Sequence, residues 1–444
     1  GKIELISPWI VNVFCGFETS NHHSYSIEEH RMWNTEIRAR EFDGGVELCT
    51  DHLRVQVCDG FKVDVYSADG RLLCADYRGE RSYEPTVNHA DLILAAQEGH
   101  EVSLVDKNHK IEILKAMQGD ECFYGFGDKT GSLNKRGCEY EMWNTNNPAP
   151  QMENVKSLYK SVPFFITLRE DCVFGLFFDN HYKTYFDMGK ENASYYYIGA
   201  DDGNLDYYMF FGENMSQVLE GYCSLTGTHE LPPLWALGYH QSRWSYESES
   251  RMRETAARLR MLGIPCDALY LDIDFMERFK VFTWDREKFP QPEKMIADLK
   301  KQGFKTVAIL DPAVKKEEGY AVYEEGAENG YFLKDKNGEI YYNKVWAGVS
   351  AYPDFSKKSV RDWWGDREGE MLDQGLEGIL MDMNEPSTFD GLMPLDVVFD
   401  NDGSPTSHKE MHNLYGNLMG KAVREGWSRA STKRPFIVTR ACFA

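Results

Sequence analysis

The sequence predicts two folds in succession: an all-β part, interpreted as a sandwich, and then an α/β part that forms an incomplete (β/α)₈ (TIM) barrel. Three observations predict them. Segments of alternating apolar and polar residues continue to about residue 230, a strand–helix–strand rhythm follows, and each candidate strand of that second part ends in polar residues. The predicted domains are therefore residues 1–230 and 231–444.

The β part is predicted from its period of two. The stretch VELCTDHLRVQVCDGFKVDVYSADG (46–70) alternates apolar and polar side chains between Gly and Asp turn signals, and CVFGLFFDN (172–180) continues the pattern. Short alternating strands with frequent turns are typical of antiparallel sheets, and the preferred interpretation is a sandwich of such sheets.

The barrel part is predicted from five apolar runs separated by segments with helical spacing. Helices are expected at 249–263, which stops at a glycine, and at 292–303. The candidate strands lie at 236–244, 266–274, 305–312, 375–385 and 434–440. Strands that alternate with helices indicate a parallel sheet.

Polar residues follow the candidate strands. They are Arg243 and Trp244, Asp272 and Asp274, Asp311, Asp382, and Arg440. A (β/α)₈ barrel carries its active site at the carboxyl ends of its strands, whereas a doubly wound sheet favours one switch point with a glycine-rich loop, and no such loop motif is present. The barrel is therefore preferred. Five strands leave an open edge, so we expect the rest of the barrel, and a C-terminal β domain, to lie outside this sequence.

Composition excludes several classes of partner. With 49 Lys and Arg against 71 Asp and Glu, the net charge of −22 argues against nucleic acid and anionic membranes as partners, and no apolar run is long enough to span a bilayer. Ten cysteines without a CxxC pair indicate reduced thiols in a cytoplasmic protein, although a secreted protein whose signal had been removed would look the same. The composition is also compatible with a homo-oligomer.

The segment LMDMNEPS (380–387) carries the strongest chemical signal. It places Asp382 at a strand end, with Asn384 and Glu385 beside it. A carboxylate held at a barrel rim suits attack on an anomeric carbon. The alternative is an acidic loop that caps the next helix.

Eight segments of the chain resemble, in order, the family 31 glycoside hydrolases, which are mostly α-glucosidases. They are YGFGDKTGSLNKRG, MWNTNNP, GYHQSRWSY, LDIDFM, ILDPAV, VWAGVSAYPDFS, DMNEPS and RPFIVTR. The first two resemble a loop that the N-terminal β domain of this family sends into the active site. The resemblance implies a retaining, exo-acting hydrolase of terminal α-linked glucose in oligosaccharides or disaccharides, which needs neither metal nor cofactor.

The resemblance also implies roles for individual residues. Asp382 would be the nucleophile, Asp272 would bind the 4-hydroxyl of the terminal glucose and Asp311 another hydroxyl. Arg440 would hold the sugar and favour the ionised form of Asp382. The remaining positions of the implied pocket are Ile273, Ile309 and Trp346 in its apolar wall, Met383 beside the nucleophile, Tyr246 where the pocket closes, and Asn146 facing the leaving-group sugar. Trp346 could instead be a core residue.

Three departures from the family pattern limit these expectations. No general acid/base is visible, because the family's HWxGD-like segment has no counterpart here, so the chain alone is not expected to be a competent catalyst. Leu380 stands where many relatives have Trp, and Asn146 where they often have Asp. An α-transglucosylase, an α-xylosidase or a catalytically silent sugar-binding homologue therefore remain as alternatives.

Overall fold

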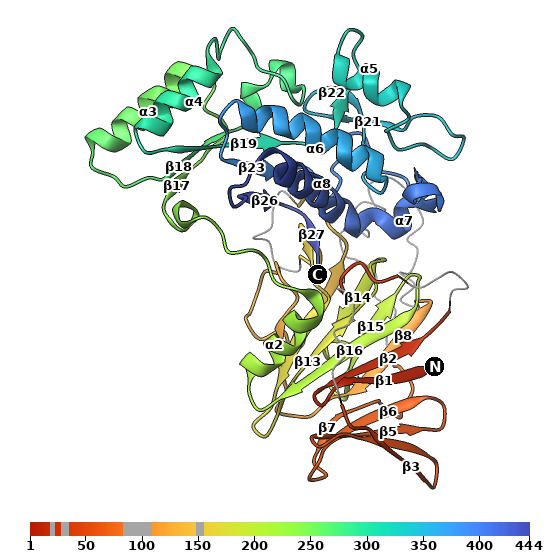
Figure 1. The fold of residues 1–444 in the computed structure, drawn as a ribbon. Helices are drawn as coiled ribbons and strands as arrows, with labels where there is room; N and C mark the ends of the chain where they lie inside the picture. Colours follow the sequence, from red (N-terminus) through yellow and green to blue (C-terminus); the bar gives the residue numbers. More distant parts are fainter. Residues whose placement is uncertain (18–22, 28–34, 83–108, 148–154) are drawn as a thin grey trace, which may run out of the picture. The chain divides into compact units, whose positions relative to one another are not determined.

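A computed structural model of the chain describes residues 1–17, 23–27, 35–82, 109–147 and 155–444 (Figure 1). The chain divides into two compact units. The first contains Gly1–Trp143, Ala149–Thr228 and Ala444, and the second contains Asn144–Pro148 and His229–Phe443. The two units are described in turn.

The first unit is built of antiparallel sheets, which confirms the predicted β-sandwich. A six-stranded sheet has the order β1 (Lys2–Ser7), β2 (Ile10–Cys15), β16 (Leu205–Gly212), β13 (Val173–Phe178), β12 (Phe164–Leu168) and β9 (Cys122–Gly125). A five-stranded sheet is a meander of β3 (Arg38–Phe42), β4 (Gly45–Cys49), β5 (Leu53–Cys58), β6 (Lys62–Ser67) and β7 (Leu72–Ala75). A four-stranded sheet has the order β10 (Glu139–Met142), β14 (Thr184–Asp187), β15 (Tyr195–Ala200) and β8 (Ile111–Ala116).

Aromatic side chains form much of the core of this unit. Phe123, Phe165 and Tyr196 are buried and contact one another edge to face, with ring centroids 5.4 to 5.9 Å apart. Such pairs are favoured over face-to-face stacks because of the quadrupoles of the rings. Helix α2 (Met215–Thr226) packs on β13 and β16 and is capped at its N-terminus by Asn214, whose side chain accepts from the Gln217 N–H. Part of the high aromatic content of the sequence is therefore structural.

The second unit contains a five-stranded parallel sheet. Its order is β17 (His240–Gln241), β18 (Ala268–Leu271), β19 (Lys305–Leu310), β23 (Gly378–Met381) and β26 (Ile437–Thr439), and every neighbouring pair is parallel. Each strand thus lies beside the strand that precedes it in the sequence, always on the same side, as in a barrel. In a doubly wound sheet the strand order reverses once. All five predicted strands are present, and the prediction of a partial barrel is confirmed.

The predicted helices are also present, as α3 (Glu249–Met261) and α4 (Pro292–Lys301). In α3 the Ser248 side chain accepts from the Arg251 N–H, a favourable N-cap, and in α4 proline occupies the first turn. Not predicted from the sequence are a small antiparallel sheet and a helix that follow β19. These are β20 (Val314–Lys315), β21 (Tyr342–Val345), β22 (Gly348–Ala351) and α5 (Ala321–Glu328).

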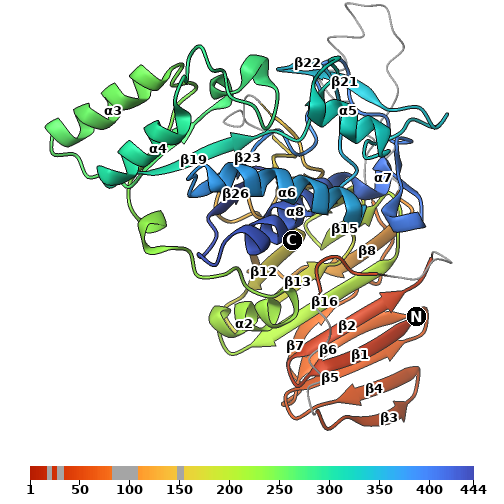
Figure 2. The ribbon, with the colours of Figure 1, turned by 45° about the horizontal axis from the view of Figure 1, so that its top comes forward.

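Helices α6 (Lys358–Asp373) and α8 (Tyr415–Ala430) lie side by side, as Figure 2 also shows. Their backbones approach closely at Gly365 and Gly426, where a Cβ on Gly426 would lie 2.5 Å from the Cα of Gly365. Only glycine allows this approach. Short α7 (His408–Met411) precedes α8. Among the described residues, no helix is both long and apolar enough to cross a bilayer, and none of the ten cysteines forms a disulfide.

Candidate active site at the strand ends

The parallel sheet brings together the polar residues that follow its strands. Asp272 follows β18, Asp311 follows β19, Asp382 follows β23 and Arg440 follows β26. The backbone ladder continues into two of these positions, because the Asp382 N–H donates to the Leu310 carbonyl at 3.2 Å and the Arg440 N–H to that of Met381 at 3.0 Å. The predicted convergence of the strand ends is therefore a consequence of strand register.

Arg440 bridges two carboxylates. Its Nη1 lies 2.9 Å from Oδ1 of Asp382, while its Nε and Nη2 donate to the two oxygens of Glu385 at 2.7 and 2.9 Å. Glu385 is only 2 % exposed, and its second oxygen also accepts from the Ser387 hydroxyl. The bidentate pair with Glu385 fixes the plane of the guanidinium group, which in turn fixes the orientation of Asp382.

The turn after Asp382 is tied to the neighbouring strand. Met383 has a left-handed backbone with φ of 56°, which is rare for a residue with a side chain. The next residue, Asn384, is fully buried; its amide donates to the Thr439 hydroxyl at 2.9 Å and accepts from the Ala441 N–H at 3.2 Å. Such over-determined contacts hold the unusual conformation of Met383 in place.

The three aspartates carry raised pKa values. Burial, together with the negative charge of Asp382, raises the pKa of Asp311 to about 8. Burial also raises the pKa of Asp272 and of Asp382, although Arg440 lowers that of Asp382. The expected effect of Arg440 on Asp382 is thus present, but burial outweighs it, because one partly exposed cation serves several carboxylates.

Asp311 is the most confined of these groups. Its side chain is buried, and its Oδ1 has no hydrogen-bond partner among the described residues. A buried polar atom without a partner is costly, and a ligand, a water or an ion that completes the bond is one explanation for it. A carboxyl group with a pKa of about 8 is mainly protonated at neutral pH, so it can both donate and accept.

The predicted apolar positions divide into two groups. Ile273, Ile309, Tyr246 and Met383 are nearly fully buried. Trp346 is 40 % exposed and contacts two other exposed aromatic residues, Trp244 at 5.2 Å and Phe389 at 4.9 Å between ring centroids. The alternative that Trp346 is a core residue is therefore wrong.

The segment that carries Asn146 is anchored through its neighbour. Asn144 is buried, with its N–H 2.9 Å from the Asn413 side-chain oxygen and its carbonyl 2.8 Å from Nε2 of His412. Asn146 itself is exposed, and no contact between it and the carboxylates is recorded among the described residues. The structure therefore brings together Asp272, Asp311, Asp382 and Arg440 but does not add Asn146 to them.

Two side-chain interactions of this unit were not predicted from the sequence. The first is Glu385 as the partner of Arg440, a pairing across 55 residues for which the sequence carries no local signal. The second is a buried histidine pair, with His408 Nε2 and His412 Nδ1 2.7 Å apart. Its i, i+4 spacing could have indicated it. Burial lowers the pKa of His408 to about 4, which favours its neutral form.

Comparison with known proteins places both units in one family. The profile of the glycosyl hydrolases family 31 TIM-barrel domain matches residues 229–444. The profile of the glycosyl hydrolase 31 N-terminal galactose mutarotase-like domain matches residues 2–187. One profile thus falls in each of the two units, although residues 188–228 of the first unit lie outside both.

Named relatives agree with these profiles. Alpha-glucosidase 2 of Bacillus thermoamyloliquefaciens is 46% identical over 360 residues, which is 80% of this chain and 45% of the relative. An alpha-glucosidase of Saccharolobus solfataricus is 30% identical over 365 residues, 77% of this chain and 52% of that protein. The chain therefore spans about half the length of these curated relatives.

A solved structure shows the same fold. The GH31 dextranase of Flavobacterium johnsoniae, determined with glucose, superposes with a TM-score of 0.87 at 33% identity, covering 100% of this chain and 52% of that one. A GH31 alpha-xylosidase from a soil metagenome superposes with a TM-score of 0.79 at 18% identity, which supports the fold alone.

Proposed function

Because the chain belongs to glycoside hydrolase family 31, we propose that it supplies the nucleophile and the sugar-binding groups of a retaining, exo-acting α-glucosidase. Asp382 is the proposed nucleophile. The observation that supports this best is its place at the end of a central parallel strand, with one oxygen held 2.9 Å from Arg440. That contact orients the carboxylate and stabilises its negative charge when the leaving group departs.

In this mechanism a carboxylate oxygen of Asp382 attacks the anomeric carbon while the bond to the leaving oxygen breaks, and water then releases the sugar. The raised pKa of Asp382 costs some nucleophilicity at low pH, since the attacking form is the ionised one. We therefore expect the acidic limb of the activity profile to follow the titration of Asp382, with activity falling as the pH decreases.

The other carboxyl groups are proposed to bind the hydroxyls of a terminal α-linked glucose. Protonated Asp311 can donate to one hydroxyl while its Oδ1, which lacks a partner among the described residues, accepts from another. Asp272, which is half-buried, accepts from the 4-hydroxyl. We further propose that an apolar wall covers the sugar faces and that one amide meets the leaving-group sugar. The wall consists of Ile273, Ile309, Met383, Tyr246 and Trp346, and the amide is that of Asn146.

A retaining reaction also needs an acid/base carboxyl roughly 5–5.5 Å from the nucleophile. Glu385 is a poor candidate, because both of its oxygens are bound by Arg440 and it is almost fully buried. We assign the acid/base to no residue of this sequence. The test of function is therefore made on the full-length protein.

The test compares full-length wild type with Asp382→Ala on p-nitrophenyl α-glucoside. We expect kcat to fall by roughly 10⁴-fold. Added azide should restore release of p-nitrophenolate from the variant and yield β-glucosyl azide, because azide attacks the anomeric carbon in place of the missing carboxylate. The exposed Asp373→Ala at the end of α6 is the matched control and should retain activity.

Two results would contradict the proposal: full activity of Asp382→Ala, or initial release of β-glucose by wild type in an NMR assay of the product anomer. The alternatives are resolved with the same protein. Turnover of the α-xyloside in preference to the α-glucoside indicates an α-xylosidase, and oligosaccharide products indicate a transglucosylase. Binding without any turnover indicates a silent sugar-binding homologue. The dextranase match makes isomalto-oligosaccharides the first natural substrates to try.

A further inference from the structure

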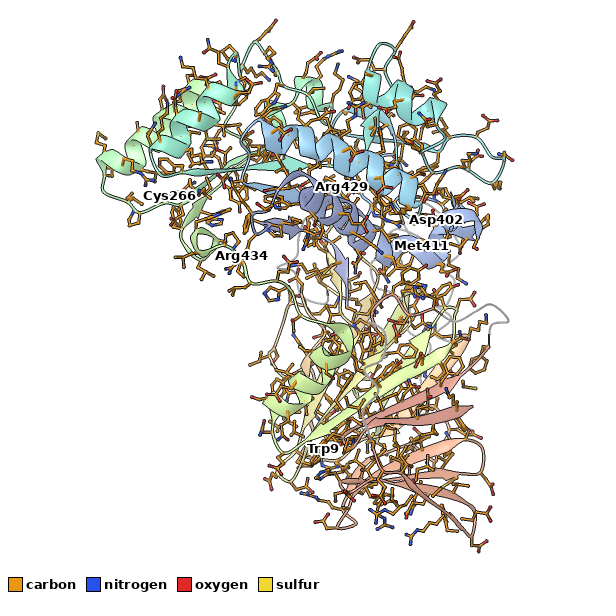
Figure 3. The ribbon with its side chains drawn as sticks, viewed as in Figure 1. Trp9, Cys266, Asp402, Met411, Arg429 and Arg434 are labelled. Atoms are coloured by element: carbon orange, nitrogen blue, oxygen red, sulfur yellow. The ribbon has the colours of Figure 1, made fainter. Side chains whose placement is uncertain are left out.

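The first unit contains a cavity of about 780 Å³. It lies where the turns of two sheets meet: the β1–β2, β4–β5 and β6–β7 turns, the β12–β13 hairpin and the start of α2 all contribute to its lining. Figure 3 shows Trp9, one of its lining residues, at the edge of this unit. The volume falls within the range typical of small-molecule sites, roughly 300–1,000 Å³. None of the residues of the carboxylate site lines this cavity.

The cavity has an apolar floor and a polar rim. Leu53, Leu73, Val173 and Phe211 line it and are buried. Around them stand exposed polar side chains, which are His52, Asp69, Arg71, Glu170, Asp171, Glu213 and Asn214. An apolar floor with a few convergent polar groups is the usual anatomy of a binding site.

An aromatic platform forms one wall. The indole of Trp9 is partly buried, and the exposed imidazole of His52 stacks on it at 4.0 Å between centroids and 18° between planes. Within the described part of the chain, neither the indole N–H of Trp9 nor the carboxylate of Glu213 has a recorded hydrogen bond. The wall therefore offers flat rings beside a donor and an acceptor that a ligand can use.

The charges of the rim select the chemistry of the ligand. Four carboxylates face two guanidinium groups, and both guanidiniums are already engaged: Arg169 binds the Asp171 carboxylate at 3.1 Å, and Arg71 donates to the Asp171 carbonyl. An anion would meet uncompensated negative charge there. A neutral molecule rich in hydroxyls has no such penalty, because carboxylates accept from its hydroxyls while an aromatic ring covers the apolar face of a pyranose.

We propose that this cavity is a second carbohydrate-binding site, which takes a segment of a neutral oligosaccharide. The choice of an α-glucan segment rests on the proposed function, but the cavity and its polarity do not. A chain held here would raise the local concentration of polymeric substrate without taking part in the reaction.

The test is titration calorimetry of the 444-residue chain with maltoheptaose and isomaltoheptaose. Three proteins are compared: wild type, the cavity variant His52→Ala/Glu213→Gln, and Trp346→Ala in the carboxylate unit. Both cavity positions are exposed, so the double variant should fold, which thermal unfolding verifies. We expect binding at the cavity to weaken at least about fivefold in the double variant and to persist in Trp346→Ala.

Identical affinity and stoichiometry in wild type and the double variant would overturn the proposal. A binding heat with inorganic phosphate but none with the oligosaccharides would also overturn the proposal, because the cavity would then be an anion site. If binding is lost in the double variant while Asp382→Ala leaves the full-length enzyme active, the second site stands and only the proposed nucleophile fails. A Trp9→Phe variant, which keeps an aromatic ring, should bind more tightly than Trp9→Leu.

Discussion

Replacing Asp311 by asparagine should stabilise the second unit, and increasingly so as the pH rises. Asparagine has the shape of a protonated carboxyl group but cannot ionise. Burial raises the pKa of Asp311 from its ordinary value of 3.8 to about 8. The folded state therefore binds this proton more tightly than the unfolded chain does. Its contribution to stability is fully present below about pH 4 and is lost as the pH rises through about 8.

The size of the effect follows from the width of the pH range between these two pKa values, 3.8 and about 8. Within it, one bound proton distinguishes the folded from the unfolded state, so wild type loses about 1.4 kcal/mol of unfolding free energy per pH unit from this group alone. The unfolding free energy of Asp311→Asn does not decrease in this way, because asparagine does not ionise. Between pH 5 and pH 7 the variant should therefore gain about 3 kcal/mol relative to wild type, an upper estimate because neighbouring carboxylates relax.

The assay is urea unfolding of both proteins at pH 5, 6 and 7. It is followed by a signal of the α/β unit, because two compact units need not unfold together. The exposed Asp373→Asn on α6 controls for the removal of one negative charge. Parallel pH profiles of wild type and Asp311→Asn would refute the reasoning, since they would mean that Asp311 is ionised in the fold or solvated.

Three further predictions concern the same unit. Arg440→Met should destabilise it by about 3 kcal/mol in urea unfolding, because the buried carboxylate of Glu385 loses its bidentate partner. Gly426→Ala should cost about 2 kcal/mol of unfolding free energy despite the better helix propensity of alanine, since its Cβ would meet the backbone of α6 at 2.5 Å. Trp346→Ala should raise KM of the full-length enzyme about tenfold while changing the unfolding free energy little, because the ring is exposed.

Two of these predictions have a matched control variant. Gly420→Ala lies in the same helix, but its Cβ would meet only the Met381 methyl at 3.5 Å, so it should stabilise α8 slightly. Arg440→Lys keeps the positive charge but loses the bidentate guanidinium group. Its free energy of unfolding should therefore lie between those of wild type and Arg440→Met. A destabilised Gly420→Ala, an unaffected Arg440→Met, or an unchanged KM in Trp346→Ala would each contradict the corresponding argument.

The strands and helices of the second unit could be predicted because their signals are local. The run KTVAILDP became β19 with Asp311 just past its end, and the helical spacing after Ser248 became α3. A strand that is buried on both faces needs apolar residues throughout, and a site at its carboxyl end needs polar residues next. Both requirements concern consecutive residues, so the positions of the strands and of the polar residues that follow them could be predicted from the sequence.

The sequence by itself therefore determined the two folds, the order of the strands and the position of Asp382 at a strand end. Only the tertiary structure decided that Arg440 would bridge Asp382 and Glu385 and that Trp346 would be exposed. It also decided that Asp311 would be buried, with one oxygen that has no partner among the described residues. The physical reason is that pairing and pKa depend on distances through space and on burial. Those are set by residues far apart in the chain, whereas periodicity is set by neighbours.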